Sequence, residues 1–273
     1  MLHLQGKWRW VMLAFAGIGV LVAAVFVWLM LAPRPEGFPI LEYHKVSDEA
    51  MEENWEYSVP AEEFRKQLDY LQSEGYTTIT ALDYMKARKG KMELPEKPVI
   101  LTFDDGYADN YEVMLPILEE HGMKAVVYMV TNDIGQKGYL TWDQLREMQT
   151  RGVEIGSHTA NHLPLTTLPA EERMDELRLS KLLMEWNGIR TVFSFSYPNG
   201  AYDQELTELL QKEEYLTAVT GDAGLNTFQT NPYLLQRVNI PRPHFGLWEF
   251  RWRLLKAEWM AKLGWKQHVG GLR

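Results

Sequence analysis

Two adjacent aspartates and a pair of histidines are the residues of this sequence best suited to chemistry. Asp104 and Asp105 end an apolar, β-branched run, and further along the chain His158 and His162 stand four residues apart. One carboxylate and two neutral imidazoles can hold a divalent metal ion and leave coordination positions open for water. The second carboxylate can accept a proton from that water. The pattern therefore predicts a metal-dependent hydrolase.

Each half of this pattern also has a simpler interpretation. An isolated Asp-Asp-Gly is typical of a polar turn after a strand, and a phosphatase-type arrangement fails because Gly106 occupies the place of its second aspartate. His158 and His162 alone could be surface imidazoles on a loop. Their spacing, however, puts both rings on one face of a helical turn, where both can reach one ion. The two pairs together favour a metal site.

Strands and helices that alternate along the sequence must position these groups. Strand-like apolar runs are predicted at residues 39–43, 77–80, 98–103, 124–130, 153–156, 192–197, 216–220 and 236–240. Amphipathic helices are predicted at residues 60–74, 81–89, 110–121, 141–151, 169–187 and 202–212. Such alternation is typical of βα units and of a largely parallel sheet, either open or closed into a barrel.

The residues suited to chemistry all follow predicted strands. His44 follows the first strand, the aspartate pair the third, the histidine pair the fifth, and Pro198-Asn199-Gly200 the sixth. In parallel α/β sheets and barrels, active sites form at the carboxyl ends of the strands. We therefore expect these residues to converge at one edge of the sheet.

Composition restricts the class of protein. The chain has 273 residues, a hydrophobic fraction of 46%, a net charge of −9 and no cysteine. The part after the first apolar stretch, roughly 240 residues, suits one large α/β domain. The negative charge argues against a nucleic-acid partner. The lack of cysteine excludes disulfides, thiolate nucleophiles and Cys-ligated zinc, and it fits an extracytoplasmic bacterial protein.

An uncharged apolar stretch, residues 11–32, precedes the expected domain. Its 22 residues would form a helix of about 33 Å, enough to cross a bilayer. Lys7 and Arg9 precede it, so the positive-inside rule predicts a cytoplasmic N-terminus and an exported catalytic domain. A cleavable signal peptide is the alternative, but the stretch ends in a poor cleavage site. We expect residues 1–32 to be a retained single-pass anchor in the cell membrane and residues 33–38 a linker.

The C-terminal stretch, residues 246–273, differs from the rest in charge. It carries six Lys or Arg against two Glu, a net charge of +4. Its large apolar residues repeat at helical spacing, and they are Trp248, Trp252, Leu255, Trp259 and Leu263. We expect a basic amphipathic helix whose tryptophan stripe packs on the barrel. The alternative is a helix on the membrane surface, with its basic residues at anionic lipid headgroups.

The sequence resembles the polysaccharide deacetylases, the NodB-type carbohydrate esterases. Residues 102–106 (TFDDG) and 157–162 (SHTANH) are similar to the first two motifs of that family, and residues 195–203 (FSYPNGAYD) to the third. Residues 41–46 (LEYHKV) and 59–76 are most similar to the branch that de-N-acetylates poly-β-1,6-N-acetylglucosamine of biofilms. The resemblance covers most of the chain.

The resemblance implies a distorted (β/α) barrel of about seven strands over residues 39–245 and a metal-dependent deacetylation. It implies three metal ligands, which are Asp105, His158 and His162. Asp104 is then the catalytic base and His44 the general acid that protonates the departing nitrogen. A histidine after a strand is more often a structural hydrogen-bonding residue, so the role of His44 depends on the resemblance.

The resemblance also implies a substrate groove that contains Tyr107, Tyr197, Pro198, Asn199 and Gly200. The backbone N–H of Asn199 would stabilise the oxyanion together with the metal. Most of the family has an arginine that orients the base at the position of Ser196, so we expect Arg237 or Arg242 to supply that cation. Zinc is the expected metal, although Co, Ni, Fe or Mn also suit these ligands.

The expected function is removal of acetyl groups from N-acetylglucosamine in an extracellular polysaccharide, poly-β-1,6-N-acetylglucosamine in the first place. Peptidoglycan is the nearest alternative substrate. Two further alternatives are an O-acetyl esterase acting on a polysaccharide and an inactive carbohydrate-binding domain that keeps the fold. An inactive domain is disfavoured because the sequence retains all four residues of the predicted site, which are Asp104, Asp105, His158 and His162. The expected partners are the acetylated polymer and the membrane, and we expect a monomer.

Overall fold

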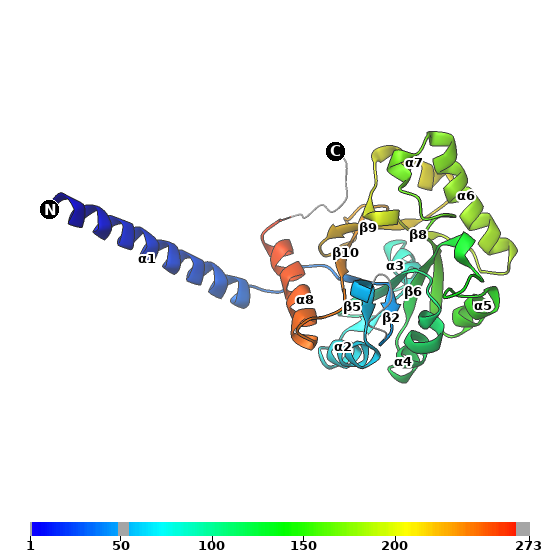
Figure 1. Cartoon of the computed structure of the whole chain (residues 1–273), viewed down its shortest axis with the longest axis horizontal. Coiled ribbons are helices and arrows are strands. Elements are labelled where there is room, and N and C mark those ends of the chain that lie inside the picture. Colours follow the sequence, from blue (N-terminus) through cyan, green and yellow to red (C-terminus); the bar gives the residue numbers. More distant parts are fainter. Residues whose placement is uncertain (1, 49–54, 266–273) are drawn as a thin grey trace.

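Seven parallel strands form a closed ring at the centre of the molecule (Figure 1). The computed structural model describes residues 2–48 and 55–265. The ring contains β1 (Ile40–Tyr43), β5 (Pro98–Asp105), β6 (Ala125–Met129), β7 (Val153–Ser157), β8 (Ser194–Ser196), β9 (Thr217–Ala223) and β10 (Leu235–Asn239). Its order is β1, β10, β9, β8, β7, β6 and β5, and β1 pairs again with β5. The predicted barrel of about seven strands is therefore confirmed.

Within the described residues, three short strands lie outside the ring. The strand β4 (Thr77–Thr78) pairs with the beginning of β5, where Thr77 lies opposite Pro98. The strands β2 (Lys45–Val46) and β3 (Ser58–Val59) form a separate parallel pair that the sequence did not predict. Strands of two residues are too short to show a hydrophobic period, which explains why they were missed.

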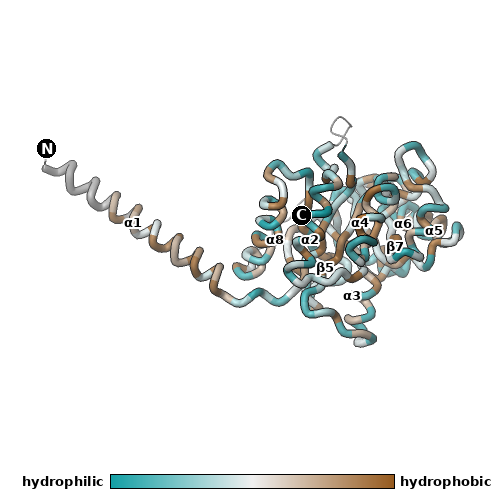
Figure 2. Tube along the Cα trace, turned by 90° about the horizontal axis from the view of Figure 1, so that it is seen from below, coloured by the Kyte–Doolittle hydropathy of each residue, from teal (hydrophilic) through white to brown (hydrophobic). Residues whose placement is uncertain are grey.

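Helices surround the ring (Figures 1 and 2). They are α2 (Ala61–Ser73), α3 (Ala81–Arg88), α4 (Leu115–Glu120), α5 (Trp142–Thr150), α6 (Ala170–Trp186) and α7 (Gln204–Lys212). A π-helical turn, Asn110–Met114, leads into α4. Single 3-10 turns lie at Trp55–Tyr57, Thr131–Asp133, Leu165–Thr167 and Pro198–Gly200. The hydroxyl of Thr141 accepts a hydrogen bond from the backbone of Gln144, so a capping box fixes the beginning of α5.

Alternation along β5 separates the barrel interior from the outer layer. Val99, Leu101 and Phe103 belong to the large apolar cluster between the strands and the helices. Ile100 belongs to a second cluster that also contains inward residues of β1, β6, β9 and β10. Because successive side chains of a strand point to opposite faces, Asp104 shares the inner face with Ile100. The strand thus delivers one carboxylate to the top of the barrel interior.

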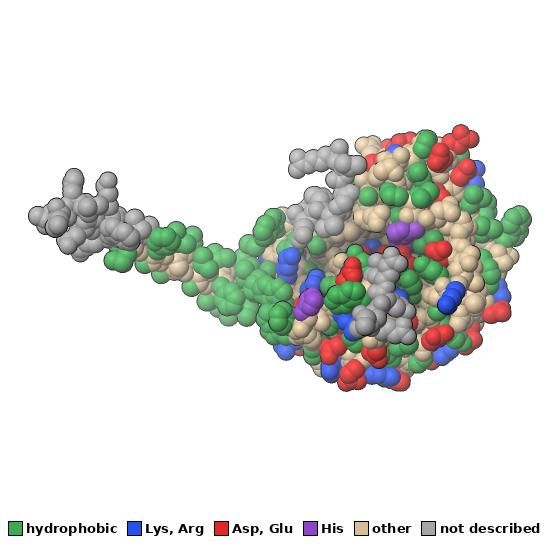
Figure 3. All heavy atoms as spheres, viewed as in Figure 1, with side chains coloured by type: hydrophobic (Ala, Val, Ile, Leu, Met, Phe, Trp, Pro, Cys, Tyr) green, Lys and Arg blue, Asp and Glu red, His purple; other side chains and the backbone are tan. Residues whose placement is uncertain are grey.

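A long helix, α1 (Leu2–Leu31), projects from the barrel, and its C-terminal end contacts α8 (Leu247–Lys262) (Figure 1). The ring of Phe26 meets the ring of Trp259 edge-on at 5.7 Å. The Nζ of Lys262 donates hydrogen bonds to the carbonyls of Leu29 and Ala32 at 2.7 and 2.9 Å. These carbonyls lie at the helix end, where the last turn leaves acceptors without helical donors. Hydrophobic side chains continue across this junction (Figure 3).

Among the described residues, no helix combines the length and the apolar character needed to cross a membrane. The predicted membrane-spanning anchor over residues 11–32 is therefore not supported. The side chains of residues 1–11 lie outside the described part of the chain, and so do Lys7 and Arg9, on which the predicted orientation depended.

The tryptophan stripe of α8 does not face the barrel, and the prediction that it packs there is wrong. The buried face of the helix consists of Phe250, Leu254, Ala257 and Met260. The ring of Phe250 meets that of Tyr70 on α2 at 6.0 Å. Trp248 is 65% exposed and Trp252 40%, and their rings lie parallel at 6.1 Å. A second apolar set, offset around the helix, makes the packing contact instead. Residues 266–273 of the predicted C-terminal segment lie outside the described residues.

Replacing Phe250 by alanine should lower the free energy of unfolding by about 3–5 kcal/mol, because the change removes a buried ring between α8 and α2. Replacing the exposed Trp248 by alanine should change that free energy by less than about 1 kcal/mol. Chemical denaturation of the two purified variants measures both quantities. Equal losses would mean that the tryptophan stripe contributes as much to packing as the opposite face.

Candidate active site

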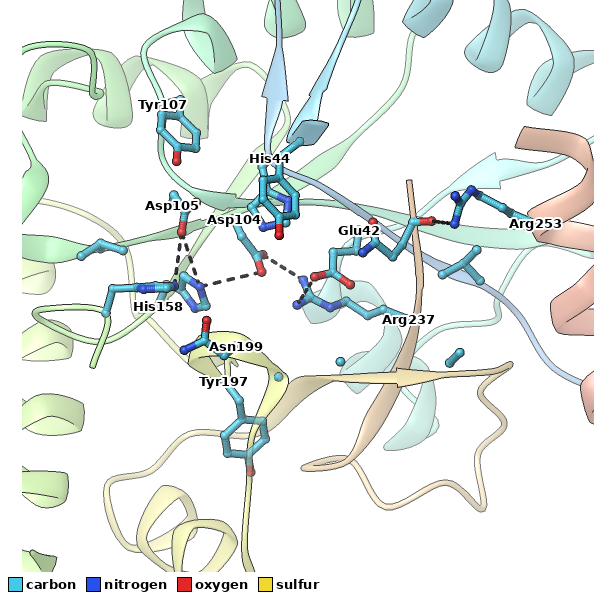
Figure 4. A pocket seen from close by; sticks show the side chains of 18 of the residues that line it. Glu42, His44, Asp104, Asp105, Tyr107, His158, Tyr197, Asn199, Arg237 and Arg253 are labelled. Carbon is cyan, nitrogen blue, oxygen red and sulfur yellow. Dashed lines mark hydrogen bonds and ion pairs between the residues drawn. The ribbon is translucent and has the colours of Figure 1, made fainter. Parts of the chain in front are cut away.

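The chemical residues meet in one cleft at the carboxyl ends of the barrel strands, with a volume of about 770 Å³. Figure 4 shows their side chains converging from several strands. The sequence-predicted residues that line it are His44, Asp104, Asp105, Tyr107, His158, His162, Tyr197, Asn199, Gly200 and Arg237. The expected convergence at one edge of the sheet is therefore found. Pro198 and Arg242 do not line this cleft.

Asp105, His158 and His162 form a compact set of potential metal ligands. The Nε2 atoms of both histidines lie 3.6 Å from the Oδ1 of Asp105. One ligand atom from each of the three residues lies within 4.8 Å of the others. Atoms this close can converge on one divalent ion, and a three-ligand set leaves a position for water. The residues thus fit the metal site that the sequence predicts.

The orientation of His158 suits metal binding. The ring is 2% exposed, and its Nδ1 lies 2.8 Å from the carbonyl oxygen of Ser196. Because a carbonyl only accepts hydrogen bonds, Nδ1 carries the hydrogen and Nε2 presents a lone pair toward Asp105. Burial lowers the pKa of His158, although the nearby carboxylates oppose the shift. The neutral imidazole that a metal requires is therefore favoured.

Backbone conformation in this region is unusual for residues other than glycine. Asp105, Thr159 and His162 have φ angles of 71°, 69° and 55°. Left-handed conformations are uncommon for such residues, and they concentrate at functional sites where the surrounding structure holds them. Two of the three are the candidate ligands themselves. The hydroxyl of Thr159 accepts a hydrogen bond from the backbone N–H of His162, which fixes the turn between them.

Glu176 on α6 binds the loop between His158 and His162. Its carboxylate accepts hydrogen bonds from the backbone N–H groups of Ala160 and Asn161 at 3.0 and 2.9 Å. The side chain of Asn161 also donates to it. Glu176 is only 7% exposed, so its charge is satisfied by this loop. This role could not be predicted from the sequence, because one glutamate among several in an amphipathic helix is typical of a solvated face.

Asp104 is held at both oxygens beside the ligand set. The Nη1 of Arg237 donates to Oδ1 at 2.9 Å, and the hydroxyl of Ser196 donates to Oδ2 at 3.0 Å. Burial acts to raise the pKa of Asp104, but the charge and the hydrogen bond of Arg237 outweigh it and hold that pKa well below its usual range. Asp104 is therefore an oriented carboxylate next to the metal site, the arrangement that a base needs.

Arg237, and not Arg242, contacts the predicted base. The guanidinium of Arg242 lies over the ring of Trp55 at 5.9 Å and donates to the carbonyl of Ser58. The two arginines follow each other closely in the sequence, but only Arg237 belongs to β10, where its side chain enters the barrel. The alternative that assigned base orientation to Arg242 is therefore wrong.

His44 lies in the cleft beside two carboxylates. Its ring packs against Tyr57 at 4.9 Å, with an angle of 41° between the planes. One side-chain atom each from His44, Glu42 and Asp104 lies within 4.8 Å of the other two. A metal is disfavoured here because Arg237 contacts both carboxylates and already supplies a positive charge. His44 is thus placed within the site, where its general-acid role remains a prediction.

The predicted groove residues divide into two groups. Tyr107 stacks on Tyr139 with ring centres 5.3 Å apart, and both line the cleft. Tyr197, by contrast, is fully buried, and its hydroxyl donates to the carbonyl of Tyr233. Figure 4 shows its ring turned away from the ligands. The Tyr197 side chain belongs to the outer apolar cluster although the residue lines the cleft, so its contact with the substrate stays a prediction.

Asn199 and Gly200 shape the wall of the cleft through their backbone. Asn199 has a φ of 57° and Gly200 a φ of 66°. A side chain on Gly200 would place its Cβ 2.4 Å from the backbone nitrogen of Gly221. Glycine at position 200 is therefore required by the close approach of β9. Pro198 is buried beneath this turn and has no contact with the cleft.

Replacing Glu176 by glutamine should weaken zinc binding by about 10–100-fold, because the loop that presents His162 loses its anionic acceptor. Isothermal titration of the metal-free protein with zinc measures this affinity. Glu172→Gln changes an exposed glutamate on the same helix and serves as the control. Equal zinc affinities for the two variants would contradict the proposed support of the loop.

Known proteins resemble this chain in both sequence and structure. Residues 91–218 match the family described as polysaccharide deacetylase. YxkH of Bacillus subtilis (strain 168), provisionally named a polysaccharide deacetylase, is 34% identical over 76% of this chain and 72% of its own length. The poly-β-1,6-N-acetyl-D-glucosamine N-deacetylase of Escherichia coli (strain K12) is 33% identical over 48% of this chain, but the match spans only 22% of that protein.

A solved structure supports the same relationship. The deacetylase PplD of Streptococcus pyogenes, in complex with acetate, superposes with a TM-score of 0.73 and is 26% identical, covering 82% of this chain and 99% of that one. The family match includes the strands that carry the aspartate and histidine pairs. Together with the geometry of the cleft, they show that the chain belongs to the polysaccharide deacetylase family, whose members are hydrolases of N-acetyl amide bonds.

Proposed function

We propose that this chain is a metal-dependent enzyme that removes acetyl groups from the N-acetylglucosamine residues of poly-β-1,6-N-acetylglucosamine. The observation that carries the proposal is the set of Asp105, His158 and His162 directly beside Asp104, an oriented carboxylate outside that set. Relatives in Escherichia coli and Staphylococcus aureus are named poly-β-1,6-N-acetyl-D-glucosamine N-deacetylases, which supports this substrate. Zinc suits the ligand types best, with Co, Ni, Fe or Mn as alternatives.

The residues of the cleft divide the reaction among them. A bound divalent ion would polarise the acetyl oxygen and acidify a water molecule. Asp104 takes a proton from the water that attacks the acetyl carbon, while Arg237 and Ser196 hold its carboxylate in place. The backbone N–H of Asn199 donates to the oxygen that becomes negative.

The carbon–nitrogen bond then breaks, and the departing nitrogen must receive a proton because the electron pair of that bond stays on it. His44 donates this proton to the departing nitrogen, which leaves an amine on the sugar and releases acetate. An amine is a poor leaving group without it, so an acid on this side of the cleft is needed. The position of His44 at the end of β1, within the same cleft, supports the assignment.

A location outside the cell is part of this proposal. The polymer is extracellular, so the catalytic domain must meet it there. Protease treatment of intact cells, followed by detection of residues 39–245, tests the location. Complete protection of the domain would contradict it. The monomeric state expected from the sequence stays a prediction.

Replacing Asp104 by asparagine should lower kcat for release of acetate by about 10²–10⁴-fold, because the amide cannot accept the proton of water. Zinc affinity should stay close to that of the wild type, since Asp104 lies outside the ligand set. The assay measures free amines on poly-β-1,6-N-acetylglucosamine, with peptidoglycan in parallel.

Asp143→Asn, a change at an exposed carboxylate, is the matched control and should leave kcat unchanged. Full activity of Asp104→Asn would remove the base from the mechanism. If the wild type preferred peptidoglycan, that polymer would replace the proposed substrate. If removal of the metal by a chelator abolished either activity, the protein would still be a metal-dependent enzyme.

Replacing His44 by alanine should lower amide hydrolysis much more than ester hydrolysis, because an alkoxide leaves with less help from an acid than an amine does. Parallel rates on an N-acetylated and an O-acetylated oligosaccharide measure the difference. Equal losses on both substrates would argue that His44 positions the substrate instead. An unaffected amide rate, with a faster rate on the ester in the wild type, would favour the O-acetyl esterase alternative.

A further inference from the structure

Glu42 is a carboxylate in the cleft that the mechanism above does not use. It lies on β1, in register with Asn239 of β10 on one side and Thr102 of β5 on the other. Alternation along β1 puts Glu42 and His44 on the inner face, while Tyr43 between them is buried in the outer cluster. Glu42 thus stands between the strand that carries Arg237 and the strand that carries Asp104.

The guanidinium of Arg237 is divided between these two carboxylates. Its Nη1 lies 2.9 Å from Asp104 Oδ1, and its Nη2 lies 3.1 Å from Glu42 Oε1. Its Nε donates to the carbonyl of Thr220 at 3.0 Å. The side chains of Arg237, Asp104 and Glu42 are 1%, 3% and 14% exposed. Figure 4 shows the guanidinium lying between the two carboxyl groups.

This division is not the usual geometry of an arginine with a carboxylate. The two commonly form a fork, in which two N–H groups contact both oxygens. Here Glu42 takes one of the two Nη groups, so only Oδ1 of Asp104 contacts the guanidinium. The other oxygen, Oδ2, accepts from Ser196 and lies on the side of His158. Without Glu42, Nη2 would be a buried donor that has lost this acceptor.

The electrostatics of the cleft also indicate that Arg237 is shared between Glu42 and Asp104. Burial raises the pKa of Glu42, and the charges of Arg237 and His44 oppose that shift, whereas Asp104 adds to it. A single buried guanidinium therefore serves two carboxylates instead of one. A base that is fully paired with a guanidinium is a weaker proton acceptor than one that shares it.

We propose that Glu42 is a positioning residue for the deacetylation. By holding one end of the guanidinium, it restricts Arg237 to a single contact with Asp104 and keeps Oδ2 of that aspartate available to accept a proton. The inference deepens the proposed function and rests on it, because it takes Asp104 as the base.

The test uses the full chain loaded with zinc and the variants Glu42→Ala and Glu42→Gln. Glu42→Ala should lower kcat on a β-1,6-linked N-acetylglucosamine oligomer by at least about tenfold, because small displacements of a catalytic group are costly. KM and zinc affinity should stay within about twofold of the wild type, as the substrate and metal contacts remain. Glu42→Gln, which keeps an acceptor oxygen for Nη2, should recover part of kcat.

Glu154→Gln is the matched control. Glu154 is a carboxylate on β7 that binds the backbone N–H of Leu82 and the hydroxyl of Ser194, and it does not line the cleft. This variant should retain the kcat of the wild type. If Glu42→Ala does not fold, the isosteric Glu42→Gln alone must show the lowered kcat. Unchanged kcat in the folded Glu42 variants, or a loss that follows zinc affinity or KM, would overturn the proposal.

A crystal structure of the Glu42 variant provides a readout that needs no turnover. In Glu42→Ala we expect the guanidinium of Arg237 to rotate toward a fork with both oxygens of Asp104, whereas in Glu42→Gln, which keeps an acceptor for Nη2, it should stay in place. An unmoved guanidinium in Glu42→Ala would overturn the proposal. A wild type that is inactive on every acetylated polymer would instead contradict the proposed function, and the two failures are therefore distinguishable.

Discussion

The site depends on one buried cation, the guanidinium of Arg237, placed between two carboxylates at the top of the barrel. A charge in that position is unfavourable unless it is paired and hydrogen-bonded. Its partners come from β1 and β5, which become neighbours only because β1 pairs with both β10 and β5. Arg237, Glu42 and Asp104 can therefore meet only where β10, β1 and β5 lie side by side.

Much of the fold could be predicted from the sequence, because the strands of this barrel are apolar runs that end in polar residues. The run before Asp104 predicted β5, and the period of the polar residues predicted the helices around it. The α8 helix shows the limit of that reasoning. It carries two apolar sets, one with Trp248 and one with Phe250, and only tertiary contacts decide which one is buried.

Site residues could be predicted from the sequence where residue type and short spacing identify them, and could not where tertiary contacts decide. The histidine pair (His158 and His162) and the aspartate pair (Asp104 and Asp105) were predicted from residue type and spacing. The choice between Arg237 and Arg242 depends on the register of β10, which shifts between Leu235 and Arg237, and no local pattern contains that information. Glu176 was missed for a related reason, because its partners lie on a loop and not on its own helix.

The position of α8 has a mechanical consequence. Its residues Arg253, Lys256 and Met260 form part of the rim of the cleft, while Lys262 grips the end of α1. The α8 helix therefore contacts both the entrance of the cleft and the end of α1, and Lys262 and Ala32, which meet there, are 230 positions apart in the sequence. Substitutions at the contact between α1 and α8 would therefore act on the same helix that supplies Arg253, Lys256 and Met260 to the cleft.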